Sequence, residues 1–160
     1  MSLALHICLA ILNGEKLWGH NTTNRGDIYY LAHEGLYGLA QRTEAALMYH
    51  GLKDDGLIFG ERGAKLTVDD DIELILADAP KLGLIVLDTM SKSVAGKDEN
   101  SNSDMAEAVE RASRLADGLG CFVLIIDHIG KEGSKKGPRG ASAKPDNADT
   151  VLMLSTDKTS

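Results

Sequence analysis

The sequence predicts an α/β fold with a mainly parallel, doubly wound sheet. Two continuous apolar runs, residues 82–87 and 121–126, have the length and composition of strands that are buried on both faces. Helical spacing of apolar residues fills much of the chain between the expected strands, as crossovers between parallel strands require. Aromatic residues make up only 4% of the chain, which favours this fold over an all-β sandwich.

The remaining elements follow from local patterns along the chain. Gly14 and Gly120 end two of the expected helices, because glycine tolerates the left-handed conformation that closes a helix. Ser101, followed by Asp104, begins the clearest helix with a pattern that resembles a capping box. Helices are expected at residues 3–13, 36–50, 68–79 and 102–119, and strands at residues 27–32, 57–59, 82–87, 121–126 and 151–154.

Composition and charge limit the class of protein. With 43% hydrophobic residues the chain can bury one sizeable core, so a single domain over residues 1–160 is the simplest organisation. A net charge of −7 argues against a generally basic nucleic-acid coat protein. Cys8 and Cys121 lie in apolar runs without a partner at metal-ligand spacing. We therefore expect two buried, reduced thiols and a cytoplasmic protein.

Polar residues with catalytic chemistry stand directly after three of the expected strands. They are Glu34, Asp88 and the pair Asp127 and His128. Ligands bind parallel sheets outside the carboxyl ends of the strands, so these side chains mark a candidate site. An apolar strand that ends in Asp is suited to holding Mg²⁺ through water beside phosphates. Each residue taken alone also fits a turn or a solvated loop, but their joint position favours a nucleotide site.

The residues at the strand ends suggest separate roles. Thr89 follows Asp88, so no second acid stands beside this aspartate to polarise an attacking water. Glu34 can supply that base from another strand end. His128 can hydrogen-bond a terminal phosphate and report its loss. Asp88, Thr89 and Asp127 are the residues expected to line the cofactor site.

A local basic segment interrupts the acidic chain and is expected to form a mobile loop at residues 130–147. Between Lys131 and Lys144 it sets five cations against the single acid Glu132. The cations are Lys131, Lys135, Lys136, Arg139 and Lys144. Such a segment can contact phosphates of nucleic acid or of a neighbour's nucleotide, and a solvated loop without such a role is the alternative.

Three segments, taken together, resemble a known family. They are Tyr30–Arg42, Leu84–Ser91 with its continuation to Met105, and Val123–Lys131 with Arg139–Ala143. In this order they are similar to three parts of the RepA-like hexameric replicative helicases, which are relatives among the RecA-type AAA ATPases. The parts are the strand with the catalytic glutamate, the Walker B strand with its acidic loop, and the sensor strand with its mobile loop. The resemblance implies a RecA-like P-loop NTPase core.

The same resemblance implies an ATP- and Mg²⁺-dependent motor that moves along single-stranded DNA. Glu34 would be the general base for water, Asp88 the Mg²⁺ partner and His128 the γ-phosphate sensor. Lys131 and Arg139 would lie on the loop that faces the central channel or the neighbouring subunit. A homo-oligomeric, hexameric ring follows from the subunit-interface sites of such proteins.

The chain departs from the family at the phosphate-binding loop. In the family, a Gly-rich loop that ends in Gly-Lys-Ser or Gly-Lys-Thr precedes the helix that begins here at Leu3, and the 160 residues contain no such loop. Asp127 stands where some members carry a histidine, and Asp149 where some relatives place an arginine finger. We therefore expect a core truncated at both ends and inactive by itself. Its exposed strand edges should make the chain poorly stable, lead it to self-associate, or leave it with weak nucleotide binding.

Two other interpretations remain open. The first is a non-catalytic RecA-like protein that has lost the phosphate loop and binds DNA or a partner. The retained Glu34, Asp88 and His128 argue against it, because a protein without hydrolysis has no use for them. The second is a phospho-receiver-like signalling domain, which needs an acidic pair after its first strand and a lone Lys after its last strand. Neither feature is evident in the sequence.

Overall fold

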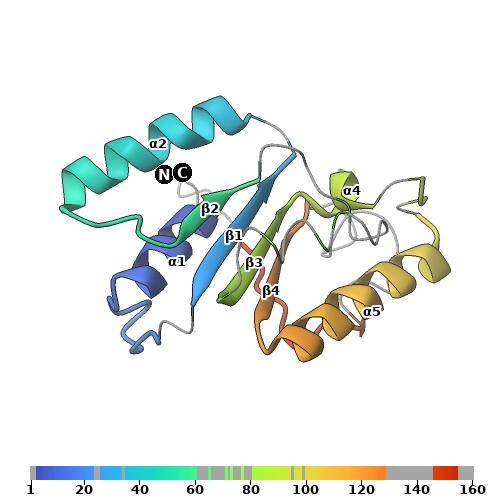
Figure 1. The fold of residues 1–160 in the computed structure, drawn as a ribbon. Coiled ribbons are helices and arrows are strands. Elements are labelled where there is room, and N and C mark those ends of the chain that lie inside the picture. Colours follow the sequence, from blue (N-terminus) through green and yellow to red (C-terminus); the bar gives the residue numbers. More distant parts are fainter. Residues whose placement is uncertain are drawn as a thin grey trace, which may run out of the picture.

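A parallel four-stranded sheet forms the centre of the molecule (Figure 1). The structure is a computed structural model that describes residues 3–23, 26–33, 35–60, 65, 71, 73, 77, 81–94, 96–98, 100–128 and 146–154. Its strands are β1 (Asp27–Ala32), β2 (Leu57–Phe59), β3 (Leu82–Asp88) and β4 (Phe122–Ile126). They lie in the order β2-β1-β3-β4, with every neighbouring pair parallel. The predicted α/β class with a parallel sheet is confirmed.

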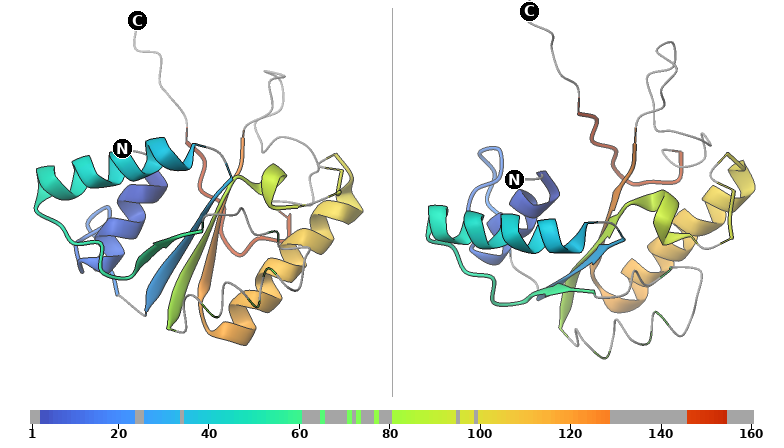
Figure 2. Two further views of the ribbon diagram at one scale, coloured as in Figure 1. Left: turned by 45° about the horizontal axis from the view of Figure 1, so that its top comes forward. Right: turned by 90° about the horizontal axis from the view of Figure 1, so that it is seen from above.

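Helices cover both faces of this sheet, as Figure 2 shows from two directions. Helices α1 (Leu3–Leu12) and α2 (Leu36–His50) pack on one face, and α5 (Asn102–Leu119) packs on the other. The short helix α4 (Met90–Ser93) follows β3 directly. This arrangement is the doubly wound architecture that the crossovers between parallel strands predict. The described part of the chain contains no helix that is long and apolar enough to cross a membrane.

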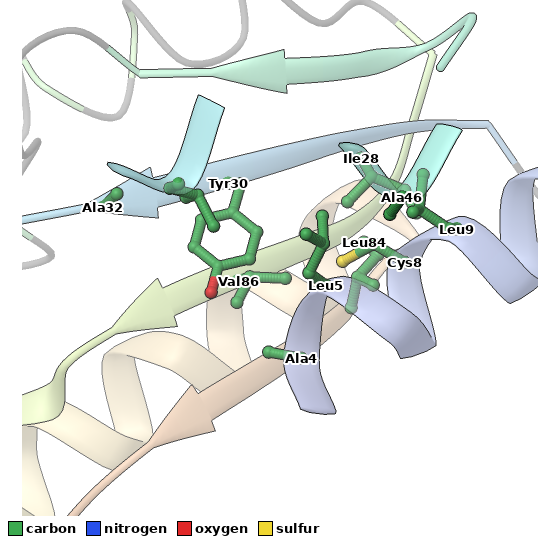
Figure 3. Packing of buried hydrophobic residues seen from close by; sticks show 11 residues of the cluster. Ala4, Leu5, Cys8, Leu9, Ile28, Tyr30, Ala32, Ala46, Leu84 and Val86 are labelled. Atoms are coloured by element: carbon green, nitrogen blue, oxygen red, sulfur yellow. The ribbon is translucent and has the colours of Figure 1, made fainter. Parts of the chain in front are cut away.

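The largest core cluster joins α1 to the sheet. Figure 3 shows Leu5 and Cys8 of α1 beside Tyr30 of β1 and Val86 of β3. All four residues have an exposed fraction of 0%. Successive strand residues point to opposite faces, so the neighbours of Tyr30 and Val86 pack against α5 on the other side. The two central strands are therefore buried on both faces, in agreement with their continuous apolar sequences.

Most element boundaries agree with the sequence pattern. The predicted bounds of β1, α2 and β2 coincide with the observed ones, and α5 begins after Ser101 as expected. The Ser101 hydroxyl accepts a hydrogen bond from the backbone N–H of Asp104 at 3.3 Å, which is one half of the predicted capping box. The helix expected at residues 68–79 lies largely outside the described residues, although residues 71, 73 and 77 are helical. Helix α4 was not predicted, because four residues are too few to show a period.

The prediction of a strand at Val151–Leu154 is wrong. These four residues form no strand, and their exposed fractions range from 46% for Val151 to 67% for Leu154. A strand needs a neighbouring backbone to pair with, and a short apolar run does not by itself supply one. Among the described strands, β4 is paired with β3 alone and forms one edge of the sheet, while β2 forms the other.

Replacing Leu5 by alanine is expected to lower the free energy of unfolding by about 3 kcal/mol, because it removes a fully buried side chain and leaves a cavity. Leu152→Ala is the matched control, since Leu152 is 62% exposed, and its effect should stay within about 0.5 kcal/mol. Urea denaturation of both variants measures the difference. Equal losses in the two variants would contradict the packing described for α1.

Both cysteines are free and buried, as predicted. Burial raises the pKa of the Cys8 thiol from 9.0 to about 12, because a thiolate is poorly solvated in the core. The unfolded chain therefore releases this proton at a lower pH than the folded chain does. Burial also raises the pKa of Cys121. Cys8 thus stabilises the fold fully below pH 9.0 and loses that contribution as the pH rises towards 12.

Because of Cys8, we expect the free energy of unfolding to fall steeply as the pH rises into the alkaline range. Between pH 9.0 and 12 it should subtract about 1.4 kcal/mol from the free energy of unfolding for each pH unit. Cys8→Ala should show a flatter limb by that amount, whatever its stability at neutral pH. Denaturant titrations at several alkaline pH values measure both slopes. Parallel slopes for the two proteins would show that the Cys8 thiol titrates normally.

Candidate functional site

The carboxyl ends of three strands are level at one edge of the sheet. In the strand register Ala32 pairs with Asp88, and Asp88 pairs with Ile126. The residues that follow β1, β3 and β4 therefore emerge side by side. Helix α1 begins near the same carboxyl ends of the strands (Figure 1). A helix N-terminus carries a partial positive charge, so this end of α1 favours anionic groups.

Asp88 is tied to β1 through both its side chain and its backbone. Its Oδ2 accepts a hydrogen bond from the Tyr30 hydroxyl at 2.8 Å. Its carbonyl oxygen accepts a hydrogen bond from the backbone N–H of His33 at 2.9 Å. Asp88 is half-buried, whereas the residues of β3 before it are buried. The strand thus delivers one carboxylate from the core to the edge of the sheet.

A second set of hydrogen bonds connects the end of β1 to α4. The hydroxyl of the fully buried Ser93 donates to the carbonyl oxygen of Thr89 at 2.9 Å and lies 3.0 Å from His33 Nε2. A hydroxyl has only one hydrogen, and Thr89 receives it, so Nε2–H of His33 is the donor to Ser93. The hydroxyl oxygen of Thr89 lies 3.3 Å from the hydroxyl oxygen of Ser91. These bonds hold the turn after Asp88 against β1.

The end of β4 brings Asp127 and His128 to the same edge. Asp127 is half-buried, and its Oδ1 accepts a hydrogen bond from the backbone N–H of His128 at 2.9 Å. The His128 side chain is exposed. It comes two residues after Ile126, the partner of Asp88 in the register, so it emerges on the strand next to that carboxylate. An exposed imidazole at this position is free to meet a bound anion.

Several predicted site residues lie outside the described residues. They are Glu34, the proposed base, and the basic residues Lys131, Lys135, Lys136 and Arg139. Their roles remain predictions. The described neighbours of Glu34 are His33, which contacts Ser93, and Gly35, which has a positive φ of 66°. Glycine suits this left-handed conformation at the turn into α2.

Tyr30, His33 and Ser93 are not among the residues predicted for this site from sequence. Tyr30 lies within the strand expected at residues 27–32, whereas His33 and Ser93 lie outside the expected helices and strands. Two of their contacts join residues 58 and 60 positions apart, from Tyr30 to Asp88 and from Ser93 to His33. The sequence signal that bears on Tyr30 is the alternation of strand side chains, but it needs the register between strands to be useful.

The chemistry at this edge fits a magnesium ion that keeps most of its water. Among the described residues there is no cluster of three or more metal-ligating side chains. Mg²⁺ in nucleotide sites commonly uses only one or two carboxylates together with phosphates and water. Asp88 provides one such carboxylate, and Oδ1 is the oxygen that the Tyr30 bond leaves available.

Comparison with known proteins adds a family assignment to this geometry. A family model described as an AAA domain matches residues 2–134. The match covers every strand of the sheet and the strand ends that carry Asp88, Asp127 and His128. A search of curated proteins found no match.

Ser93→Ala is expected to lower the free energy of unfolding by about 1–3 kcal/mol. The substitution removes the two hydrogen bonds through which the Ser93 hydroxyl joins the Thr89 carbonyl to Nε2–H of His33, although this carbonyl also accepts from the backbone N–H groups of Lys92 and Ser93. Ser103→Ala is the control, because Ser103 is exposed and its hydroxyl lies 3.0 Å from the hydroxyl of Ser101, which is also at the surface. Thermal and urea unfolding measure both variants. A Ser93 variant as stable as the control would show that this bridge does not hold the turn.

Proposed function

The chain belongs to the AAA domain family, and from this membership we propose that it forms the core of an ATP-hydrolysing motor acting on single-stranded DNA. Membership gives it an ATPase-type domain that binds nucleotide. One observation carries the more specific proposal. Asp88 ends a strand that is buried on both faces, and it does so level with the end of β4, which leads to Asp127 and His128. Strand ends of this kind hold nucleotide in parallel sheets.

We assign the roles at this edge by chemistry. Asp88 holds Mg²⁺ through water beside the phosphates of ATP, and the bound ion supplies charge stabilisation there. Thr89 and Asp127 line the same cofactor site. His128 is exposed at the next strand end, where its imidazole can hydrogen-bond the terminal phosphate. Glu34 follows β1 in the sequence and acts as the general base that orients and deprotonates the attacking water.

The DNA-binding part of the proposal depends on charge. The chain carries a net charge of −7, so its overall field repels nucleic acid. The basic residues between Lys131 and Lys144 are the local exception, and they follow the strand that carries His128. Contacts from such a segment to the DNA backbone would couple ATP binding and hydrolysis to the affinity for DNA. A ring of subunits, as in the replicative helicases that the sequence resembles, would place these segments around one strand.

Asp88→Asn is expected to reduce ATP hydrolysis by about a hundredfold or more, because the neutral amide cannot hold Mg²⁺ where the phosphates need it. The assay uses the protein expressed from its complete reading frame, with Mg²⁺ and with or without single-stranded DNA. The unsubstituted protein should hydrolyse ATP faster when DNA is present, and this stimulation should fall as the salt concentration rises.

Asp117→Asn is the matched control for charge. Asp117 is exposed near the end of α5, away from the carboxyl edge of the sheet, and its substitution should leave hydrolysis unchanged. Hydrolysis that survives in Asp88→Asn would remove Asp88 from the site. If the unsubstituted protein binds nucleotide but does not hydrolyse it, the result would instead favour the non-catalytic interaction protein. Hydrolysis that DNA does not stimulate would leave an ATPase but refute the DNA motor.

A further inference from the structure

Tyr30 is a buried tyrosine whose hydroxyl meets the carboxylate at the centre of the site. Its exposed fraction is 0%, and its hydroxyl donates to Asp88 Oδ2 at 2.8 Å. A buried phenol needs an acceptor, and an ionised carboxylate gives a stronger bond than a neutral one. In Figure 3 the hydroxyl of Tyr30 lies next to Val86, which comes two residues before Asp88 in β3. The contact therefore crosses from β1 to the strand end that carries the carboxylate.

The ring of Tyr30 is held from several sides. Its partners in the strand register are Phe59 of β2 and Val86 of β3. The rings of Tyr30 and Phe59 lie with centroids 5.8 Å apart and planes tilted by 52°. Leu5 of α1 belongs to the same buried cluster and lies beside the ring (Figure 3). A ring confined in this way keeps its hydroxyl in one place.

We propose that Tyr30 is a positioning residue that orients the Asp88 carboxylate for Mg²⁺. The tyrosine hydroxyl donates a hydrogen bond to Oδ2, so Oδ1 can accept a hydrogen bond from the water shell of the ion. Without this bond, a half-buried carboxylate at a strand end would sample several rotamers, and fixing one of them costs conformational entropy at each binding event. Substituting a residue that orients a metal-binding group commonly lowers affinity for the metal by roughly tenfold to a hundredfold. This inference rests on the proposed function, because it concerns the same site.

The test is a Mg²⁺ titration of nucleotide binding by Tyr30→Phe in the protein expressed from its complete reading frame. Phenylalanine keeps the packed ring and removes only the hydroxyl. The probe is a fluorescent ATP analogue. Its binding is measured at increasing Mg²⁺ concentrations and, in a separate experiment, in EDTA. The apparent Kd for Mg²⁺ should rise roughly tenfold, as for other groups that orient a metal-binding residue. Binding of the analogue in EDTA should not change, because the ring still supports the fold.

Two further variants separate positioning from a general effect on the fold. Tyr29→Phe is the matched control, because Tyr29 is 5% exposed and packs in the cluster on the opposite face of the sheet. It should leave the apparent Kd for Mg²⁺ unchanged. In a protein that already carries Asp88→Asn, adding Tyr30→Phe should produce no further change in the response to Mg²⁺. That result would show that Tyr30 acts through Asp88.

The outcomes distinguish this inference from the proposed function. If the unsubstituted protein binds the analogue in a Mg²⁺-dependent way and Tyr30→Phe gives the same Mg²⁺ curve, the positioning role is refuted and the proposed function stands. An equal loss of binding in EDTA and in Mg²⁺ would also refute positioning, because it indicates a structural effect. If the unsubstituted protein binds the analogue with no dependence on Mg²⁺, both the inference and the proposed site fail.

Discussion

The parallel pairing of β1 with β3 is the constraint on which the rest of the molecule depends. These two strands lie at the centre of the sheet and are buried on both faces, so a shift of one strand by one residue would exchange its side chains that pack against α1 with those that pack against α5. The register that satisfies both faces pairs Ala32 with Asp88 and aligns the strand ends. It also places Tyr30 and Asp88 on the same face, close enough for a hydrogen bond of 2.8 Å. The core and the candidate site are therefore fixed by one choice of register.

The sequence predicts the elements of this fold better than the contacts between them. The strand that ends at Asp88 is evident because its apolar run is continuous and stops at a carboxylate, which is a local pattern. The bond from Tyr30 is not evident, because it depends on how two strands far apart in the chain align. Ser93 was missed for the same reason, since its partner His33 lies on another strand end. The positions of Asp88, Asp127 and His128 at the strand ends can thus be predicted from sequence, whereas the contacts that orient Asp88 cannot.

The incorrect strand at residues 151–154 illustrates a second limit of sequence patterns. An apolar tetrapeptide has the composition of a strand, but a strand exists only where a neighbouring backbone completes its hydrogen bonds. The side chains of Val151 and Leu154 are exposed, so neither pairing nor burial stabilises an extended conformation there. In β1 and β3 both kinds of stabilisation are present, and the predicted strands are found. Burial and pairing together, more than apolar composition, decide which segments become strands.

The central claim is that nucleotide and its metal bind at the carboxyl edge of the sheet, beside Asp88. The most direct measurement replaces Mg²⁺ by paramagnetic Mn²⁺ and records amide NMR spectra of the protein from its complete reading frame with ATP. Signals of His33, Asp88, Thr89 and His128 are expected to broaden. Signals of the turn at residues 17–20, which precedes β1 at the opposite end of the strands, are expected to stay sharp. Broadening at the turn, or uniform broadening that ATP does not localise, would contradict the claim and place the metal elsewhere.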